Sequence, residues 1–128
     1  MYKRQGVGGW HDLAIVARLG DSAPGYPLGT TLQEVGIVAH SRNGHVIVEA
    51  TAVEPSGEHH TAYFRWHSGV LERLVEVGEA YETTKITGVL SSAGELTAGG
   101  PATIADDGRW TTIIGLEDGR SVAVVFPA

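Results

Sequence analysis

The chain has 128 residues, the size of one domain or of a piece of a larger one, and a net charge of −6. A surface of that sign repels phosphate, so we expect no nucleic-acid partner, and no apolar run approaches the roughly 20 residues that span a bilayer. Cysteine is absent, which excludes disulfides and thiolate metal sites, whereas 18 glycines with abundant Thr and Val indicate an all-β chain with many tight turns.

The N-terminal residues are set apart from the fold. Residues 1–5, MYKRQ, resemble the translated end of a transposon-based sequencing adapter. Gly6–Gly9 is glycine-rich but lacks the preceding strand and following helix that a phosphate loop needs. We therefore expect residues 1–9 to be disordered or artefactual, and residues 10–128 to be a single all-β repeat domain. On this interpretation the chain is the C-terminal part of a longer reading frame.

The middle of the chain predicts four consecutive strands. Apolar and β-branched residues favour strands at Glu34–Ser41, His45–Val53, His59–Trp66 and Val70–Val77. The leucine spacing of the fourth segment also fits a helix, but eight residues between two glycines favour a strand. Asn43-Gly44 predicts a tight hairpin turn, and the EPSGE stretch predicts the next one. The four strands thus form an antiparallel meander.

A second, similar unit follows. Gly99–Phe126 has the pattern of three strands separated by Asp-Asp-Gly and Glu-Asp-Gly turns. Its first turn aligns with Asn43-Gly44, and its RSVAVVF stretch aligns with HTAYFRW in the first unit. The IVARLGDS stretch that begins at Ile15 aligns with LVEVGEAY, placing Leu19 opposite Gly78. We therefore predict two repeats, repeat one at about 34–77 and repeat two at about 99–126.

The phase of the repeats predicts the architecture. Leu13–Arg18 corresponds to the fourth strand of a unit without its first three strands, and the last unit lacks its fourth. β-Propellers divide one blade between the termini in this way. We predict an all-β fold of two tandem four-stranded antiparallel meanders resembling propeller blades, with a strand at about 12–18 completing the last blade beside Ser121–Phe126. A sandwich, two neighbouring blades with one bare side, or self-associating copies that bury open sheet edges all remain possible.

Two loops are the expected place for a binding surface. Gly20–Gln33 and Gly78–Gly100, which contains a short predicted strand at Lys85–Leu90, carry the crossings between units, and loops on a rigid scaffold commonly carry function. If aromatic rings from strands and loops line one face, they form a surface for stacking sugars; core packing is the alternative for the tryptophans. The candidate ligand-binding residues are Tyr26, Trp66, Tyr81 and Trp110.

The sequence predicts no catalytic residue, metal site or cofactor. His59 and His60 face opposite sides of a strand, and His40 with His45 across the hairpin turn would supply only two of the ligands that zinc prefers. The acidic turns lack the alternating oxygens of a calcium loop. The GDSAP stretch at Gly20–Pro24 lacks the second glycine of a nucleophile elbow.

One motif resembles a known family. Val16–Gly25, VARLGDSAPG, is similar to the AREGDPAPG element of a bacterial tandem-repeat family with N-x-x-G-x-x-A-F motifs and varied anchoring signals. Gly119–Ala128 is similar to the end of the last repeat in such proteins. The motif itself is altered here, with Ser41 for the Asn, Ile47-Val48 for the Ala-Phe and only Gly108 kept in the second copy. The resemblance implies propeller-blade-like repeats in a secreted or surface-anchored protein, and supplies no catalytic residue.

These observations favour a non-enzymatic structural or interaction module from a secreted or cell-surface repeat protein. A glycan or small-ligand binding module that uses the loops between units is the second hypothesis. The C-terminal part of a propeller-type enzyme is the third. The extracellular location rests on the resemblance, since no export signal is visible in the chain.

Overall fold

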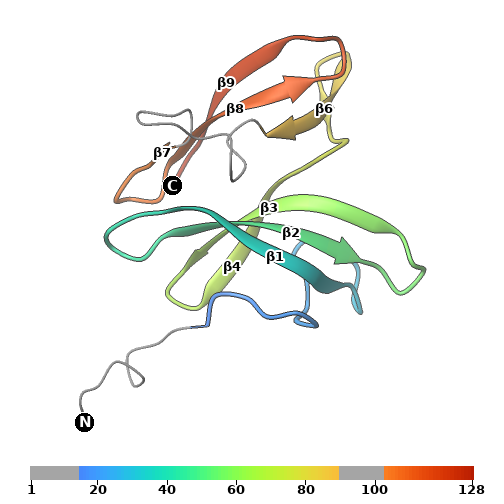
Figure 1. Cartoon of the computed structure of the whole chain (residues 1–128), viewed down its shortest axis with the longest axis vertical. Coiled ribbons are helices and arrows are strands. Elements are labelled where there is room, and N and C mark those ends of the chain that lie inside the picture. The colour runs from blue at the N-terminus through green and yellow to red at the C-terminus, as the bar shows by residue number, and fades with distance from the viewer. Residues whose placement is uncertain (1–14, 90–102) are drawn as a thin grey trace.

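The computed structural model describes residues 15–89 and 103–128, and all regular structure in these ranges is β (Figure 1). The strands form two antiparallel sheets, which confirms the predicted all-β fold of two meanders. Sheet one contains β1 (Thr31–His40), β2 (Val46–Val53), β3 (His59–His67) and β4 (Val70–Glu76). Sheet two contains β5 (Ala80–Tyr81), β6 (Thr84–Val89), β7 (Thr103–Ile104), β8 (Trp110–Leu116) and β9 (Ser121–Phe126).

Sheet one is a simple meander with the order β1-β2-β3-β4. Its first hairpin turns at Gly44, whose φ of 92° lies in the left-handed region that glycine adopts without strain. The segment from Val70 is a strand rather than a helix, as its glycine flanks indicate. β1 begins earlier than predicted, because Thr31 bridges Ser22 and Leu32 exchanges backbone hydrogen bonds with the preceding loop.

Sheet two repeats the pairing register of sheet one. β8 is central, with β9 on one side and both β6 and β7 on the other. The matched residue pairs are Val46↔Trp66 with Trp110↔Phe126, His40↔Val46 with Ile104↔Trp110, and Leu32↔Ala52 with Ile86↔Leu116. The two turns that close these hairpins also match, since Gly108 has a φ of 95°. The predicted repeat is therefore present in the backbone pairing itself.

β6 and β7 together correspond to β1. A register shift follows Leu32 in β1, and an equivalent shift follows Ile86 in β6. β1 is one continuous strand. In sheet two its two ends correspond to separate strands, β6 and β7, and more residues lie between these two strands than between the corresponding ends of β1. The second repeat thus extends back to Thr84, and the short strand predicted at Lys85–Leu90 is its first strand.

Two hydrophobic clusters hold the structure together. The inner core lies between the sheets and joins side chains of both, whereas the outer core lies on the opposite face of sheet one, which we call its outer face. The inner core contains Val38, Ile47, Tyr63, Val75, Ile86, Val89, Trp110, Ile114 and Leu116. The outer core contains Ala23, Leu32, Val48, Ala50, Ala52, Ala62 and Phe64.

The N-terminal segment lies against the outer face of sheet one, which differs from the prediction for Leu13–Arg18. Leu13 lies outside the described residues. Ile15–Arg18 forms no strand, and Val16 and Ala17 pack on the outer core, on the side of sheet one away from sheet two (Figure 1). Burial of these two side chains places the segment there. Within the described residues, β9 pairs with β8 alone.

The same connection nevertheless occurs twice. Gly20 N–H donates to Leu32 O at 2.7 Å, and Gly78 N–H donates to Ile86 O at 2.7 Å. The following acidic residue in each copy accepts the return bond on its carbonyl, Asp21 from Leu32 and Glu79 from Ile86. Gly20 therefore matches Gly78, which corrects the sequence alignment by one residue, because side-chain similarity aligned the strands without the turn hydrogen bonds.

Candidate functional site

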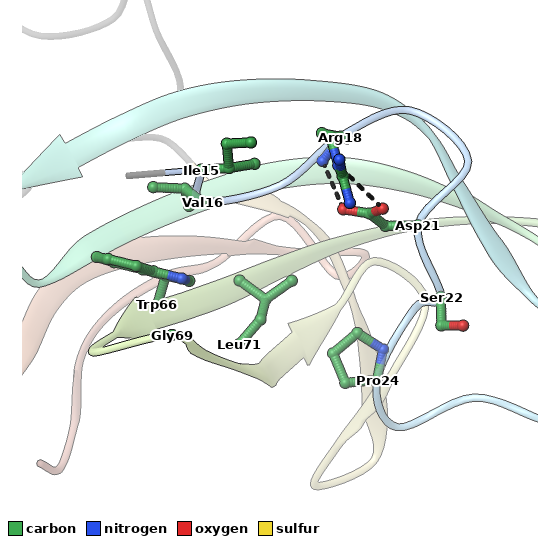
Figure 2. A pocket seen from close by; sticks show the side chains of 9 residues that line it. All are labelled: Ile15, Val16, Arg18, Asp21, Ser22, Pro24, Trp66, Gly69 and Leu71. Carbon is green, nitrogen blue, oxygen red and sulfur yellow. Dashed lines mark hydrogen bonds and ion pairs between the residues drawn. The ribbon is translucent and has the colours of Figure 1, made fainter. Parts of the chain in front are cut away.

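A groove of about 450 Å³ lies on the outer face of sheet one (Figure 2). Trp66 near the end of β3 and Leu71 on β4 form one side of it, and Ile15 and Val16 of the N-terminal segment form the other. Trp66 is half-buried, whereas Ile15 keeps 64% of its surface exposed. The groove is thus an apolar slot between a strand pair and the covering segment.

The charged rim of the groove is internally compensated. The backbone N–H of Arg18 donates to Asp21 Oδ2 at 2.8 Å, and Arg18 Nε lies 3.5 Å from Asp21 Oδ1. An exposed pair of this kind contributes little to stability, but it neutralises the rim. The groove therefore offers contact area to an apolar or aromatic group beside a charge-compensated rim.

The four candidate aromatic residues do not share a surface. Trp66 lines the groove, and Tyr26 lies over the opposite end of β3, where its ring is 4.9 Å from that of His60. Tyr81 packs against the inner core. Trp110 is fully buried there, with its ring 5.3 Å from Phe126, and its indole N–H has no hydrogen-bond partner among the described residues. Core packing is therefore the role of Trp110.

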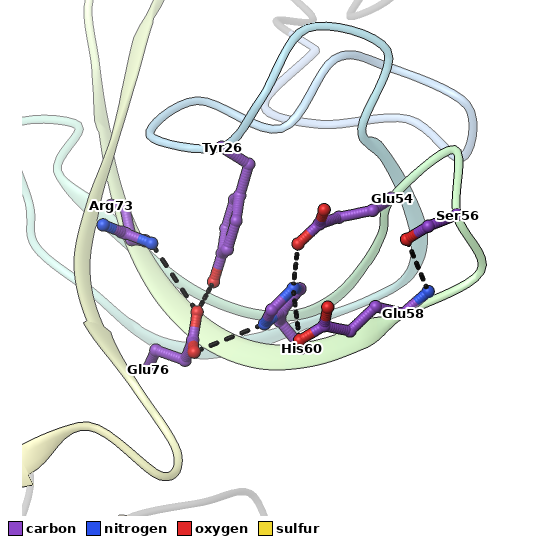
Figure 3. A network of polar contacts seen from close by, with 7 residues as sticks. All are labelled: Tyr26, Glu54, Ser56, Glu58, His60, Arg73 and Glu76. Atoms are coloured by element: carbon purple, nitrogen blue, oxygen red, sulfur yellow. Dashed lines mark hydrogen bonds and ion pairs between the residues drawn. The ribbon is translucent and has the colours of Figure 1, made fainter.

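A polar cluster surrounds His60 at the other end of the outer face (Figure 3). His60 Nε2 lies 2.6 Å from Glu54 Oε2, and its Nδ1 lies 3.3 Å from Glu76 Oε2. Glu76 also accepts a hydrogen bond from the Tyr26 hydroxyl. The Arg73 guanidinium completes the cluster, 4.6 Å above the Tyr26 ring and 3.6 Å from Glu76 Oε1. The cluster joins the β2–β3 turn, β4 and the N-terminal loop.

The carboxylates around His60 favour its charged form. Burial of the ring opposes that charge, but the hydrogen bond to Glu54 and the negative charges of Glu76 and Glu58 outweigh burial and raise the pKa of His60. Burial and the hydrogen bond to Glu76 raise the pKa of Tyr26 to about 12. Tyr26 therefore stays a hydrogen-bond donor at neutral pH, and the cluster acts as a set of ion pairs.

The same cluster contains the atoms that could hold a metal. Glu54, Glu58 and His60 each offer one ligand atom, and these atoms lie within 4.8 Å of one another. Nitrogen and oxygen ligands of this kind suit zinc. Because Nε2 already lies 2.6 Å from Glu54, a cation would have to displace the proton there. Sequence reasoning placed His59 and His60 on opposite sides of the strand and did not bring the two turn carboxylates to His60.

A second polar contact connects the two sheets. Buried Arg65 on β3 donates from Nη1 to Gly108 O at 2.8 Å and to Pro127 O at 2.7 Å, and from Nη2 to Glu72 Oε1 at 2.8 Å. These bonds tie sheet one to the first hairpin turn and the C-terminal end of sheet two. The sequence gives no local signal for this contact, because its partners are backbone carbonyls far along the chain.

A histidine pair lies beside Arg65. The ring of His45 stacks on that of His67 with centroids 3.8 Å apart, rather than on His40, the partner considered for it across the hairpin turn. Burial and the neighbouring charges of His67 and Arg65 lower the pKa of His45. The ring of His45 packs between His67 and the turn at Gly108, where its surroundings favour the neutral form.

Comparisons with protein-family models, with curated proteins and with solved structures gave no match. In the ranges 15–89 and 103–128 no helix is long and apolar enough to cross a membrane.

Proposed function

We propose that the chain is a non-catalytic structural or interaction module, built from blade-like repeats that stack sheet upon sheet, in a secreted or cell-surface protein. The observation that carries this proposal is the repeated connection, with the same hydrogen bonds at Gly20 and at Gly78. In each copy the acidic side chain after the glycine also accepts a backbone N–H three residues earlier, at 2.8 Å in Asp21 and 3.1 Å in Glu79.

The packing supports stacking as the role of the repeat. Leu32 and Ile86 occupy equivalent places after the connection, one buried in the outer core and the other in the inner core. Ala62 and Phe64 of β3 correspond in register to Val122 and Val124 of β9, which pack on the inner core. The outer face of sheet one thus has the same construction as the face that sheet two turns towards sheet one. A repeat of this type gains stability from each neighbour.

A tandem fusion tests the stacking role. Two copies joined from Ala128 to Met1 should unfold at a higher midpoint than the single chain, by roughly 4 °C for each kcal/mol of new interface. The matched control carries Val125→Lys in the first copy, which places a charge on the exposed face of sheet two. A fusion that unfolds at the midpoint of the single chain would contradict the proposal.

The cellular location needs a separate test. The resemblance of Val16–Gly25 to surface-anchored repeat proteins supports an extracellular location. We expect the upstream reading frame to encode an export signal and further blade-like repeats. A frame that starts at Met1, with no such signal, would contradict this part of the proposal.

A small-ligand binding module is the second candidate, favoured by the groove beside Trp66. Its apolar walls and neutralised rim suit the face of a sugar ring or another flat group. Titration with each sugar of a panel should then change the tryptophan fluorescence of the chain. Trp66→Phe should remove that change. If the wild-type fluorescence is unaffected across the panel, the sugar-binding hypothesis fails.

A further inference from the structure

The outer edge of β9 has no strand beside it in the described structure. In sheet one the equivalent strand β3 lies between β2 and β4. In sheet two β9 pairs with β8, and within the described residues nothing pairs with its other edge. In an antiparallel pair half of the backbone groups of a strand point away from its partner, so the outer edge of β9 presents a row of donors and acceptors that no described strand pairs.

Within the Ile15–Arg18 segment, Ile15–Ala17 has the matching unsatisfied backbone, whereas both backbone groups of Arg18 bond to Asp21. Its position before Gly20 corresponds to the position of β4 before Gly78, as the shared turn hydrogen bonds show. Among the described residues, the backbone N–H and C=O groups of Ile15–Ala17 have no hydrogen-bond partner. Val16 and Ala17 meanwhile pack on the outer core, as their equivalents Leu74 and Val75 pack in the inner core. The segment is thus a β4 equivalent, already seated on a sheet, with a free edge.

The repeat fixes the register in which the two edges would pair. β3 and β4 pair as Ala62↔Glu76, Tyr63↔Val75 and Phe64↔Arg73. The equivalent pairs between β9 and the N-terminal segment are Val122↔Arg18, Ala123↔Ala17 and Val124↔Ile15. The bond from Val77 N–H to Thr61 O corresponds to one from Leu19 N–H to Ser121 O.

The faces that this pairing brings together are apolar. On β9, Val125 points away from the inner core and is 57% exposed. On sheet one the outer face exposes Ile37 at 62% and Val35 at 40%, and both line a hollow together with Val16 and Ala17 of the N-terminal segment. Exposed apolar side chains on a flat sheet are a common site of association.

We propose that β9 of one copy adds to the Ile15–Arg18 segment of a second copy, so that sheet two of the first copy stacks on the outer face of sheet one of the second. This inference rests on the proposed stacking function and names its partner. The contact joins two different surfaces, so it propagates head to tail and closes into a ring or continues as a filament.

Cysteine cross-linking of the full chain tests the register, because the chain has no cysteine of its own. Opposed residues in an antiparallel ladder lie within the distance that a disulfide spans. Ala17→Cys mixed with mass-tagged Ala123→Cys should give the mixed disulfide dimer under mild oxidation. The control mixture pairs Ala17→Cys with Ser56→Cys, an exposed residue of the β2–β3 turn, and should give much less. Equal yields from the two mixtures would overturn the pairing.

Solution mass provides the second test. The wild-type chain should associate as its concentration rises, and Val125→Lys should weaken that association by at least about tenfold, with an unchanged circular dichroism spectrum. Val125→Thr, which keeps the shape without the charge, should have a clearly smaller effect. A wild-type chain that stays monomeric at its highest soluble concentration overturns the inference. If the tandem fusion is nevertheless stabilised, stacking is retained between repeats of one chain; if it is not, the proposed function fails as well.

Discussion

Alanine at Gly108 should cost far more stability than alanine at Gly44, although the two glycines occupy the same turn in the two repeats. Their φ angles are 95° and 92°, so both substitutions force an L residue into the left-handed region. A Cβ on Gly44 would meet nothing within 4 Å, whereas a Cβ on Gly108 would lie 2.7 Å from Cδ2 and 2.9 Å from Nε2 of His45. Gly44→Ala is therefore a matched control for the backbone cost.

The magnitude follows from these two contributions. The left-handed conformation costs roughly 1–2 kcal/mol for a residue with a Cβ, and this cost applies to both variants. The contact with His45 adds the cost of overpacking, about 1–3 kcal/mol, to Gly108→Ala alone. The imidazole cannot simply withdraw, because it stacks on His67 at 3.8 Å and is buried. The difference corresponds to a melting midpoint roughly 4–12 °C lower for Gly108→Ala than for Gly44→Ala.

Thermal unfolding, monitored by circular dichroism, measures both variants together with His45→Ala alone and the double variant His45→Ala with Gly108→Ala. Removing the imidazole should abolish the part of the loss that comes from the contact, so the second substitution should cost much less in the His45→Ala background than in the wild type. Equal midpoints for Gly44→Ala and Gly108→Ala would refute the reasoning. So would a loss at Gly108 that is independent of His45.

Three further substitutions test the contacts between and beside the sheets. Arg65→Met should lower the free energy of unfolding by about 2 kcal/mol, because it leaves the buried Gly108 carbonyl without its donor, and urea titration measures this; a loss near zero would contradict the role of Arg65. Trp110→Ala should cost about 3–5 kcal/mol in the same assay, since its ring is fully buried, whereas a loss below about 1 kcal/mol would contradict its place in the inner core. For His60, whose pKa is raised on folding, the charged ring adds stability that is complete below its ordinary pKa near 6.5 and is lost as pH rises through the folded-state pKa. The loss of stability caused by His60→Gln should therefore be larger at pH 5.5 than at pH 8.5, and a pH-independent loss would show that Glu54 does not hold the charged form.

Local patterns predicted most of the strands and the repeat. Gly44 and Gly108 supply the positive φ of the two hairpin turns, and the alternating residues of the flanking strands leave few choices of pairing. The leucine spacing of β4 also fits a helix, but the glycines that flank this segment correctly favoured a strand. The predicted boundaries failed where the chain makes contacts beyond its own hairpin, as at Thr31, which bridges Ser22.

Local sequence patterns did not predict the contacts of the candidate site. His60 contacts one carboxylate of the adjacent turn and a second carboxylate, that of Glu76 on β4. Only the register of β3 with β4 brings Glu76 close enough. Arg65 bonds to carbonyls of sheet two, which carry no side-chain signature. The N-terminal segment was predicted to lie at the edge of β9, and its motif correctly identified it as a β4 equivalent. Its position on sheet one depends on the packing of Val16 and Ala17, which pairing rules do not address.

The groove beside Trp66 has a cause that the repeat makes visible. The residue of sheet two that corresponds in register to Val46 is Trp110, and both pack against the cluster on their own face. Trp110 fills the space between the sheets, whereas Val46, with a much smaller side chain, lies next to Trp66 in the ladder and packs at the edge of the outer core. The inner interface is therefore filled by its own large aromatic residue. The outer face of sheet one, built on the same plan, instead has a slot of about 450 Å³, which Trp66 and Leu71 line together with the N-terminal segment.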